Sequence, residues 1–155
     1  MTSRDKKKLN IYFDNCCFNR PYDNQAQLRI ELETKAKLFI QNLVVDGKVK
    51  LTISSVSRLE NNDNPFPFRR MAITDFFRNA DFIVTSTDEI RTMASNLVND
   101  GLKSKDSAHI ACAISAECDY FITTDDKLLK RNIDHINIID PTEFLRIWED
   151  RENDE

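Results

Sequence analysis

The sequence predicts an α/β fold of three layers, in which a central, mainly parallel sheet of about five strands is covered by helices on both faces. The order of the elements is the first observation behind this prediction, because short apolar strands alternate with helical segments almost throughout the chain. The second is size: 155 residues, 41% hydrophobic and 31% charged, suffice for one globular domain. Two glycines and four prolines leave little room for a linker. We therefore expect a single domain over 1–155, with frayed tails at 1–7 and 149–155.

The strands and helices can be placed from the residues alone. Strands are expected where β-branched and aromatic residues run together without glycine or proline, at 8–13, 48–53, 81–85, 119–123 and 136–139. Helices are expected where capping residues precede helical periodicity, at 25–45, 55–60, 68–79, 88–99, 104–117, 126–131 and from Pro141 onward. A loop over 19–24 precedes the first helix.

Three details of these helices can be checked directly. The helix ending near Val45 has an apolar stripe, typical of a helix packed on a core, at Leu28, Leu32, Phe39 and Leu43. The helix at 68–79 offers Met71, Phe76 and Phe77 as apolar contacts. Ser104 is expected to cap the helix at 104–117.

Composition excludes several classes of function. A net charge of -4 provides no overall positive field for nucleic acid, although a local basic rim is compatible with it. No apolar run approaches the length of a membrane span, and the basic start of the chain leads directly into a strand, so a cytoplasmic protein is expected. The four cysteines lack metal or redox spacing and are expected to be free thiols.

Four separated acids, Asp14, Glu60, Asp106 and Asp125, lie just after or near short apolar runs. Strand ends gather along one edge of such a sheet, where α/β proteins place their sites. Converging carboxylates repel one another unless a hard cation neutralises them, and Mg²⁺ or Mn²⁺ takes oxygen ligands of this kind. The acids therefore predict a metal-dependent, phosphate-handling site, with at least one carboxyl pKa raised when no metal is bound.

Each acid also has an ordinary structural interpretation. Asp14 suits a turn, and Glu60 suits an exposed helix surface, paired with Arg58 or Arg69. Asp106 lies where the helix dipole favours a carboxylate, yet it shares a stripe with apolar residues and is expected to point along the buried face. Either Asp125 or its neighbour Asp126 can cap the next helix while the other faces the site. His109, one turn after Asp106, either borders the site or packs in the core.

Three segments together resemble the PIN domain family, whose best-known prokaryotic members are toxin ribonucleases of VapC type. They are IYFDNCC (11–17), SSVSRLE (54–60) and KSKDSAHIACAISAECDYFITTDDKLLK (103–130), and the resemblance extends from about Leu9 to Trp148. In that family four acids at matching places bind Mg²⁺ or Mn²⁺, which implies the same role for Asp14, Glu60, Asp106 and Asp125.

The resemblance implies an endoribonuclease, with an antitoxin protein and a homodimer as expected partners. Supporting roles near the metal are expected for Asn15, Thr123 and Asp126. RNA phosphates are expected to meet a basic rim made of Arg20, Arg58, Lys103, Lys105 and Lys127. The family often has Ser or Thr within two residues of the first acid, where this chain has Asn15 and Cys16; Asn15 can still orient Asp14 by hydrogen bonding.

Other classes fit less well. A haloacid dehalogenase-type phosphatase normally needs a second Asp at the position of Cys16, and the paired acids of a response-regulator receiver are not evident. The remaining alternative is a PIN-like binding module with little or no nuclease activity, because fold does not guarantee chemistry.

Overall fold

A five-stranded, fully parallel sheet forms the centre of the protein, which we describe from a computed structural model over residues 7–154. The strand order is β3-β2-β1-β4-β5. The strands are β1 (Asn10–Phe13), β2 (Lys50–Ser54), β3 (Phe82–Val84), β4 (Tyr120–Ile122) and β5 (Asn137–Ile139). In register, Ile11 lies opposite Leu51 of β2 on one side and Tyr120 of β4 on the other.

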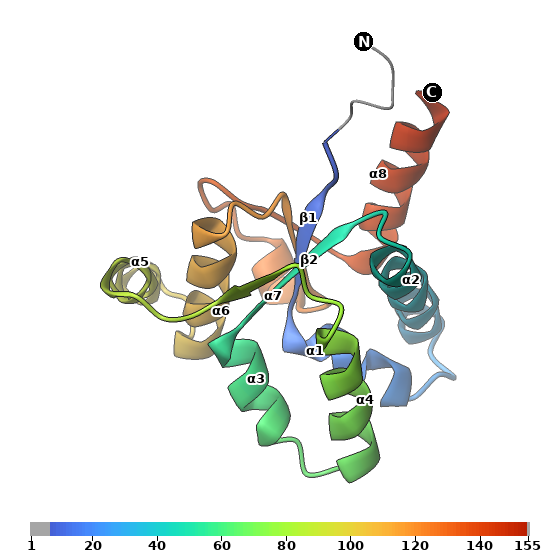
Figure 1. Cartoon of the computed structure of the whole chain (residues 1–155), viewed down its shortest axis with the longest axis horizontal. Coiled ribbons are helices and arrows are strands. Elements are labelled where there is room, and N and C mark those ends of the chain that lie inside the picture. Colours follow the sequence, from blue (N-terminus) through green and yellow to red (C-terminus); the bar gives the residue numbers. More distant parts are fainter. Residues whose placement is uncertain (1–6, 155) are drawn as a thin grey trace.

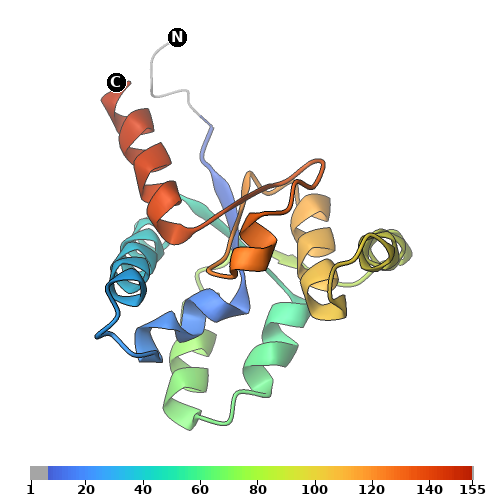
Figure 2. The same ribbon diagram turned by 180° about the vertical axis from the view of Figure 1, so that it is seen from behind.

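Helices cover both faces of this sheet, so the predicted three-layer α/β/α architecture is confirmed (Figure 1). The helices are α1 (Asn15–Asn19), the 3-10 helix η2 (Arg20–Tyr22), α2 (Leu28–Val45), α3 (Ser55–Asn62), α4 (Pro67–Phe77), α5 (Asp88–Asn99), α6 (Ser104–Ser115), α7 (Asp126–Leu129) and α8 (Pro141–Asn153). In Figures 1 and 2, α2 and α8 lie side by side on one flank of the sheet, and α5 and α6 lie on the other. Helices α1, α3 and α4 lie at the end of the molecule where β1 and β2 finish.

Two apolar clusters, one on each face of the sheet, hold the layers together. Alternation along β1 sends Ile11 and Phe13 into the cluster beneath α2, α4 and α8, and Tyr12 into the cluster beneath α5 and α6. All three side chains are almost fully buried. The central strand is therefore inaccessible along its length, so a site on this strand has to lie at one of its ends.

The expectation for the face of α2 that packs on the sheet is wrong. Leu28, Leu32 and Phe39 are 70%, 48% and 49% exposed, and of the predicted stripe only Leu43 is buried. The buried face instead includes Ile40 and two charged residues, Glu33 and Lys37. Burial of Glu33 is tolerated because Arg20 and Arg29 both pair with its carboxylate.

Local differences from the sequence expectation have identifiable causes. Residues 15–19 form helix α1 directly after β1, because Asp14 caps it. Ser104 is the first residue of α6, and Lys103 takes the cap position without a side-chain bond. Met71 is 61% exposed, since Ile73 takes the inward position on α4.

The C-terminal segment expected to fray from 149 is helical through Asn153. Arg146 pairs with Glu143 and Asp150 on α8, and Arg151 donates a 2.7 Å bond to the carbonyl of Lys7. Residues 1–6 and 155 of the predicted tails lie outside the described residues. Within residues 7–154, no helix is both long and apolar enough to cross a bilayer.

Candidate active site

The candidate site lies at the carboxyl ends of β1 and β4. Asp14 directly follows β1, and the segment from Thr123 to Asp125 directly follows β4. These two strands are neighbours, and the chain winds outward from β1 through β2 to β3 before it restarts on the other side at β4. Open α/β sheets bind ligands in the crevice outside such a reversal of strand order.

Asp14 is a buried carboxylate held in a fixed orientation. Its Oδ1 accepts a 2.8 Å bond from the main-chain N–H of Asn15. Its Oδ2 accepts a 2.8 Å bond from the hydroxyl of Thr123 and a 3.4 Å contact from the thiol of Cys16. Asn15 thus orients Asp14 as expected, but through its backbone, and Cys16, two residues after Asp14, contacts the same carboxylate through its thiol.

Asp106 is brought to the same edge by the first turn of α6. It is half-buried, and burial together with the nearby carboxylates of Asp14 and Asp125 raises its pKa above the ordinary 3.8. Asp125 itself caps α7, its Oδ1 accepting a 2.9 Å bond from the N–H of Lys127. The three aspartates form what we call the aspartate cluster, and the expected upward shift in pKa is found at Asp106.

The chemistry of the aspartate cluster suits a divalent cation, although its present geometry does not form a closed metal cage. Among residues 7–154, no three His, Cys, Asp or Glu side chains are grouped closely enough to hold one ion, so the predicted convergence on a shared ion is not seen. The donors are nevertheless carboxylate oxygens, the ligands that Mg²⁺ and Mn²⁺ prefer. Burial, and after it repulsion by Asp14 and Asp125, raises the pKa of Asp106, and a bound cation would offset both effects by stabilising the ionised carboxylate.

Glu60 lies at the same edge in a different environment. Its Oε1 accepts a short hydrogen bond from Nε2 of His109, a fully buried residue of α6. Nδ1 of His109 lies 2.6 Å from the hydroxyl of Tyr12. If the ring carries its proton on Nε2, Nδ1 accepts from Tyr12, and burial raises the pKa of Tyr12 so that it retains this proton.

The chain Tyr12–His109–Glu60 is completed by two serines. The hydroxyl of Tyr12 lies 2.6 Å from that of Ser54 and 3.0 Å from that of Ser57. Burial alone would raise the pKa of Glu60, but the bond to His109, with contributions from Lys105 and Asn15, holds it below the ordinary 4.5. Sequence analysis did not find Tyr12, Ser54 or Ser57, because their partners are distant in the sequence.

The other predicted site residues divide into three groups. Asp126 pairs with Arg29 at 2.7 Å, and Arg20 pairs with Glu33 and Asp23, so these charges are engaged within the protein. Arg58 lines a separate cavity of about 400 Å³ between α3, α4 and β3. The basic residues of the remaining group lie near the acids: Lys103, Lys105 and Lys127.

A pocket of about 260 Å³, the acid pocket, opens beside Asp106 and Asp125. Lys103, Lys127 and Arg131 supply positive charge to its lining. Arg131 was not predicted, because a basic residue after a short helix looks like ordinary surface charge. Gly101 also lines this pocket at φ +105, a backbone conformation that favours glycine, and it lies beneath the guanidinium of Arg131.

No protein-family model matches the chain, and no curated protein matches it in sequence. Among solved structures, it is similar to VapBC2 from Rickettsia felis, crystallised with a DNA fragment from the VapBC2 promoter. The match covers 84% of this chain and 97% of that chain, with a TM-score of 0.54 and 12% sequence identity. At this identity the likeness shows the fold alone, and it agrees with the three-layer α/β architecture.

Proposed function

We propose that this protein is a metal-dependent endoribonuclease of the PIN type, which hydrolyses RNA phosphodiester bonds with Mg²⁺ or Mn²⁺. The observation that carries the proposal is the meeting of Asp14, Asp106 and Asp125 at the carboxyl edge of the sheet, at the reversal of strand order, where Asp106 and Asp125 line one pocket. The raised pKa of Asp106, caused by burial and by the two neighbouring carboxylates, supports it. Repelling carboxylates at a ligand-binding edge cost stability, and a bound cation offsets that cost. The fold likeness to VapBC2 supports the class of protein without assigning its activity.

The residues of the site have distinct roles in this proposal. Asp14, Asp106 and Asp125 would hold the ion, and Glu60 would lie beside it, oriented by His109. A divalent ion in such a site lowers the pKa of a bound water and neutralises phosphate charge. Thr123 fixes Asp14 for this task, while Lys103, Lys127 and Arg131 are placed to contact phosphates of the RNA.

The same proposal extends to the partners and location of the protein. We infer that it acts in the cytoplasm as the toxin of a toxin–antitoxin pair, bound by an antitoxin and forming a homodimer. The similarity to VapBC2 supports this inference at the level of the fold. The exposed apolar stripe of α2 offers a surface for protein contact.

A binding module without nuclease activity is the second candidate. The observation that favours it is the absence, among residues 7–154, of three ligands already close enough for one ion. The two candidates differ in what Mn²⁺ does. A nuclease binds the ion at the aspartate cluster and cleaves RNA, whereas a binding module retains RNA or a protein partner without cleavage.

The test combines Mn²⁺ binding by calorimetry with cleavage of a mixed-sequence RNA. We expect wild-type protein to bind Mn²⁺ and to cleave RNA until EDTA is added. Asp106→Asn should keep its fold by circular dichroism but lose cleavage by about 100-fold or more and bind Mn²⁺ more weakly, because the ion loses a ligand. Asp75→Asn, at an exposed acid of α4, is the matched control and should behave as wild type. Cleavage by Asp106→Asn at the wild-type rate would overturn the assignment.

A further inference from the structure

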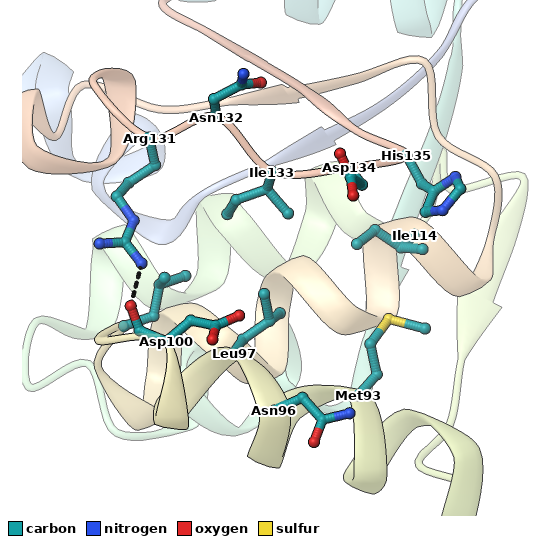
Figure 3. Close-up of a pocket in the computed structure, with 11 residues that line it drawn as sticks. Met93, Asn96, Leu97, Asp100, Ile114, Arg131, Asn132, Ile133, Asp134 and His135 are labelled. Atoms are coloured by element: carbon teal, nitrogen blue, oxygen red, sulfur yellow. Dashed lines mark hydrogen bonds between the residues drawn. The ribbon is translucent and has the colours of Figure 1, made fainter.

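A second cavity, the apolar slot, lies between α5, α6 and the segment that joins α7 to β5. Its volume is about 390 Å³, within the range of small-molecule sites. In Figure 3, Ile133 of the connecting segment faces Met93 and Leu97 of α5, with Ile114 of α6 beside them. Met93, Ile114 and Ile133 are only half-buried, so the slot presents apolar surface that no other part of the described chain covers.

The apolar slot adjoins the acid pocket. Leu102 and Arg131 line both cavities, so these two residues form the boundary between them. Arg131 donates a 2.7 Å bond to the carbonyl of Asp100, which fixes its guanidinium at this boundary. Figure 3 shows Arg131 at one end of the slot and His135 at the other. An RNA strand with one phosphate at the acid pocket therefore has the adjacent nucleotide beside the slot.

The lining of the slot suits a flat ring with hydrogen-bond donors on its edge. Aliphatic side chains on opposite walls, with the thioether of Met93 among them, pack well against the faces of an aromatic ring. Two exposed carboxylates, Asp100 and Asp134, and two exposed amides, Asn96 and Asn132, also belong to the lining. An amide both donates and accepts, so it serves any base edge, whereas an ionised carboxylate only accepts hydrogen bonds. The preference therefore comes from the carboxylates, which favour a ring that carries an amino group and disfavour one flanked by carbonyls.

We propose that the apolar slot binds a nucleobase bearing an exocyclic amino group, namely adenine, guanine or cytosine, from the nucleotide next to the reacting phosphate. This proposal rests on the proposed ribonuclease function and adds a base preference to it. Uracil is the disfavoured base, because two carbonyl oxygens flank its single edge N–H. Arg131 contacts the phosphate that joins this nucleotide to the next. The base then lies in the slot on one side of its guanidinium, and the reacting phosphate lies in the acid pocket on the other side.

Methyl NMR on the full chain tests this binding without any cleavage. The probes are AMP, GMP, CMP and UMP, with ribose 5-phosphate as the probe that lacks a base. We expect the three amino-bearing nucleotides to shift the methyl signals of Met93 and Ile133, UMP to bind several-fold more weakly, and ribose 5-phosphate to leave both signals unchanged. Met71, exposed on α4, is the internal control. Equal shifts from ribose 5-phosphate, or no shift from any nucleotide at millimolar concentration, would overturn the proposal.

Two substitutions on one helix separate the slot from the reaction. Met93→Trp fills the slot, whereas Val98→Trp places the same ring on α5 at a residue that does not line it. We expect Met93→Trp to weaken CMP binding by about tenfold or more, with Val98→Trp near wild type. Asp134 is exposed, so Asp134→Asn should fold normally. We expect this substitution to reduce the ratio of the affinity for CMP to the affinity for UMP.

The two proposals fail in distinguishable ways. If RNA is cleaved but Met93→Trp cleaves with wild-type rate and sequence preference, the base slot is wrong and the ribonuclease assignment stands. If nucleotides shift Met93 and Ile133 but no RNA is cleaved with either metal, the ribonuclease assignment is wrong and nucleotide binding in the slot stands.

Discussion

The aspartate cluster and Glu60 lie at the same edge of the sheet but experience opposite electrostatic environments. Asp106 has like charges as neighbours, and its pKa is raised by burial and by Asp14 and Asp125. Glu60 has a hydrogen-bond donor as its neighbour, and its pKa is lowered although burial opposes this. Four acids that look equivalent in the sequence therefore divide into a cluster of mutually repelling carboxylates and a carboxylate already paired with His109.

This difference indicates two kinds of contribution to the site. The cluster costs stability in the protein without a cation, as expected of groups kept for binding. The chain Tyr12–His109–Glu60 joins β1, α6 and α3, so it contributes to the fold as well as to the site. Substitutions in the two regions should therefore have opposite effects on stability.

The largest expected effect is the loss of the centre of this chain. His109→Leu leaves the buried hydroxyl of Tyr12 and the half-buried Glu60 without their partner, and we expect the free energy of unfolding to fall by about 3 kcal/mol. Urea denaturation measures this change. His135→Asn at the other, exposed histidine is the control, because asparagine tolerates the positive φ there. Equal stability of the two variants would show that the chain contributes nothing to the fold.

Neutralising one acid in each region should give smaller effects of opposite sign. Glu60→Gln keeps an acceptor for His109 but loses the charge-assisted bond, which we expect to cost about 1 kcal/mol. Asp106→Asn removes repulsion and should leave the stability of the metal-free protein unchanged or increased. Unfolding curves in EDTA make this comparison. A large loss of stability in Asp106→Asn would mean that Asp106 serves mainly to start α6.

The smallest expected effect is a difference in pH dependence. Because the pKa of Asp106 is raised above 3.8, its contribution to stability is present at lower pH and is lost as pH rises through the raised value. Because the pKa of Glu60 is lowered below 4.5, its contribution is present above that value and is lost as pH falls through the lowered one.

The free energy of unfolding, measured against pH in EDTA, should therefore respond differently in the two variants. Wild type should lose stability as pH rises through the raised pKa of Asp106, and Asp106→Asn should reduce this loss. Wild type should also lose stability as pH falls through the lowered pKa of Glu60, and Glu60→Gln should reduce that loss. The matched measurement is urea unfolding of both variants and wild type over the same pH series. Identical profiles for all three proteins would contradict the division of the acids into two kinds.

Much of the fold was predictable from the sequence, because parallel strands buried on both faces leave a strong local signal. All five strands fall where apolar runs predicted them, and α5 spans the predicted residues 88–99. The face of α2 was not predictable, because Glu33 and Lys37 look like surface residues until Arg20 is brought beside Glu33 and the ring of Phe18 beside Lys37. An apolar stripe on a helix indicates a face that favours contact with other apolar groups, but the stripe alone does not identify the sheet as its partner.

The site was partly predictable for a related reason. Strand ends identify Asp14 and Asp125, and a helix start identifies Asp106, because each position follows from local structure. The pairing of Glu60 with His109 and the place of Arg131 on the pocket boundary depend on contacts between distant segments. Those contacts are set by packing, so no spacing in the sequence reveals them.

The central position of β1 has a consequence for synthesis of the protein. Thr123, which holds Asp14, lies 109 residues later in the chain, and β1 pairs with β4 across a similar separation. Such non-local pairing forms late and slowly. During translation β1 can pair with β2 early, but the edge next to β4 stays open until that strand emerges. The candidate site therefore stays incomplete until the segment from Thr123 to Asp125 has been made and β4 has paired with β1.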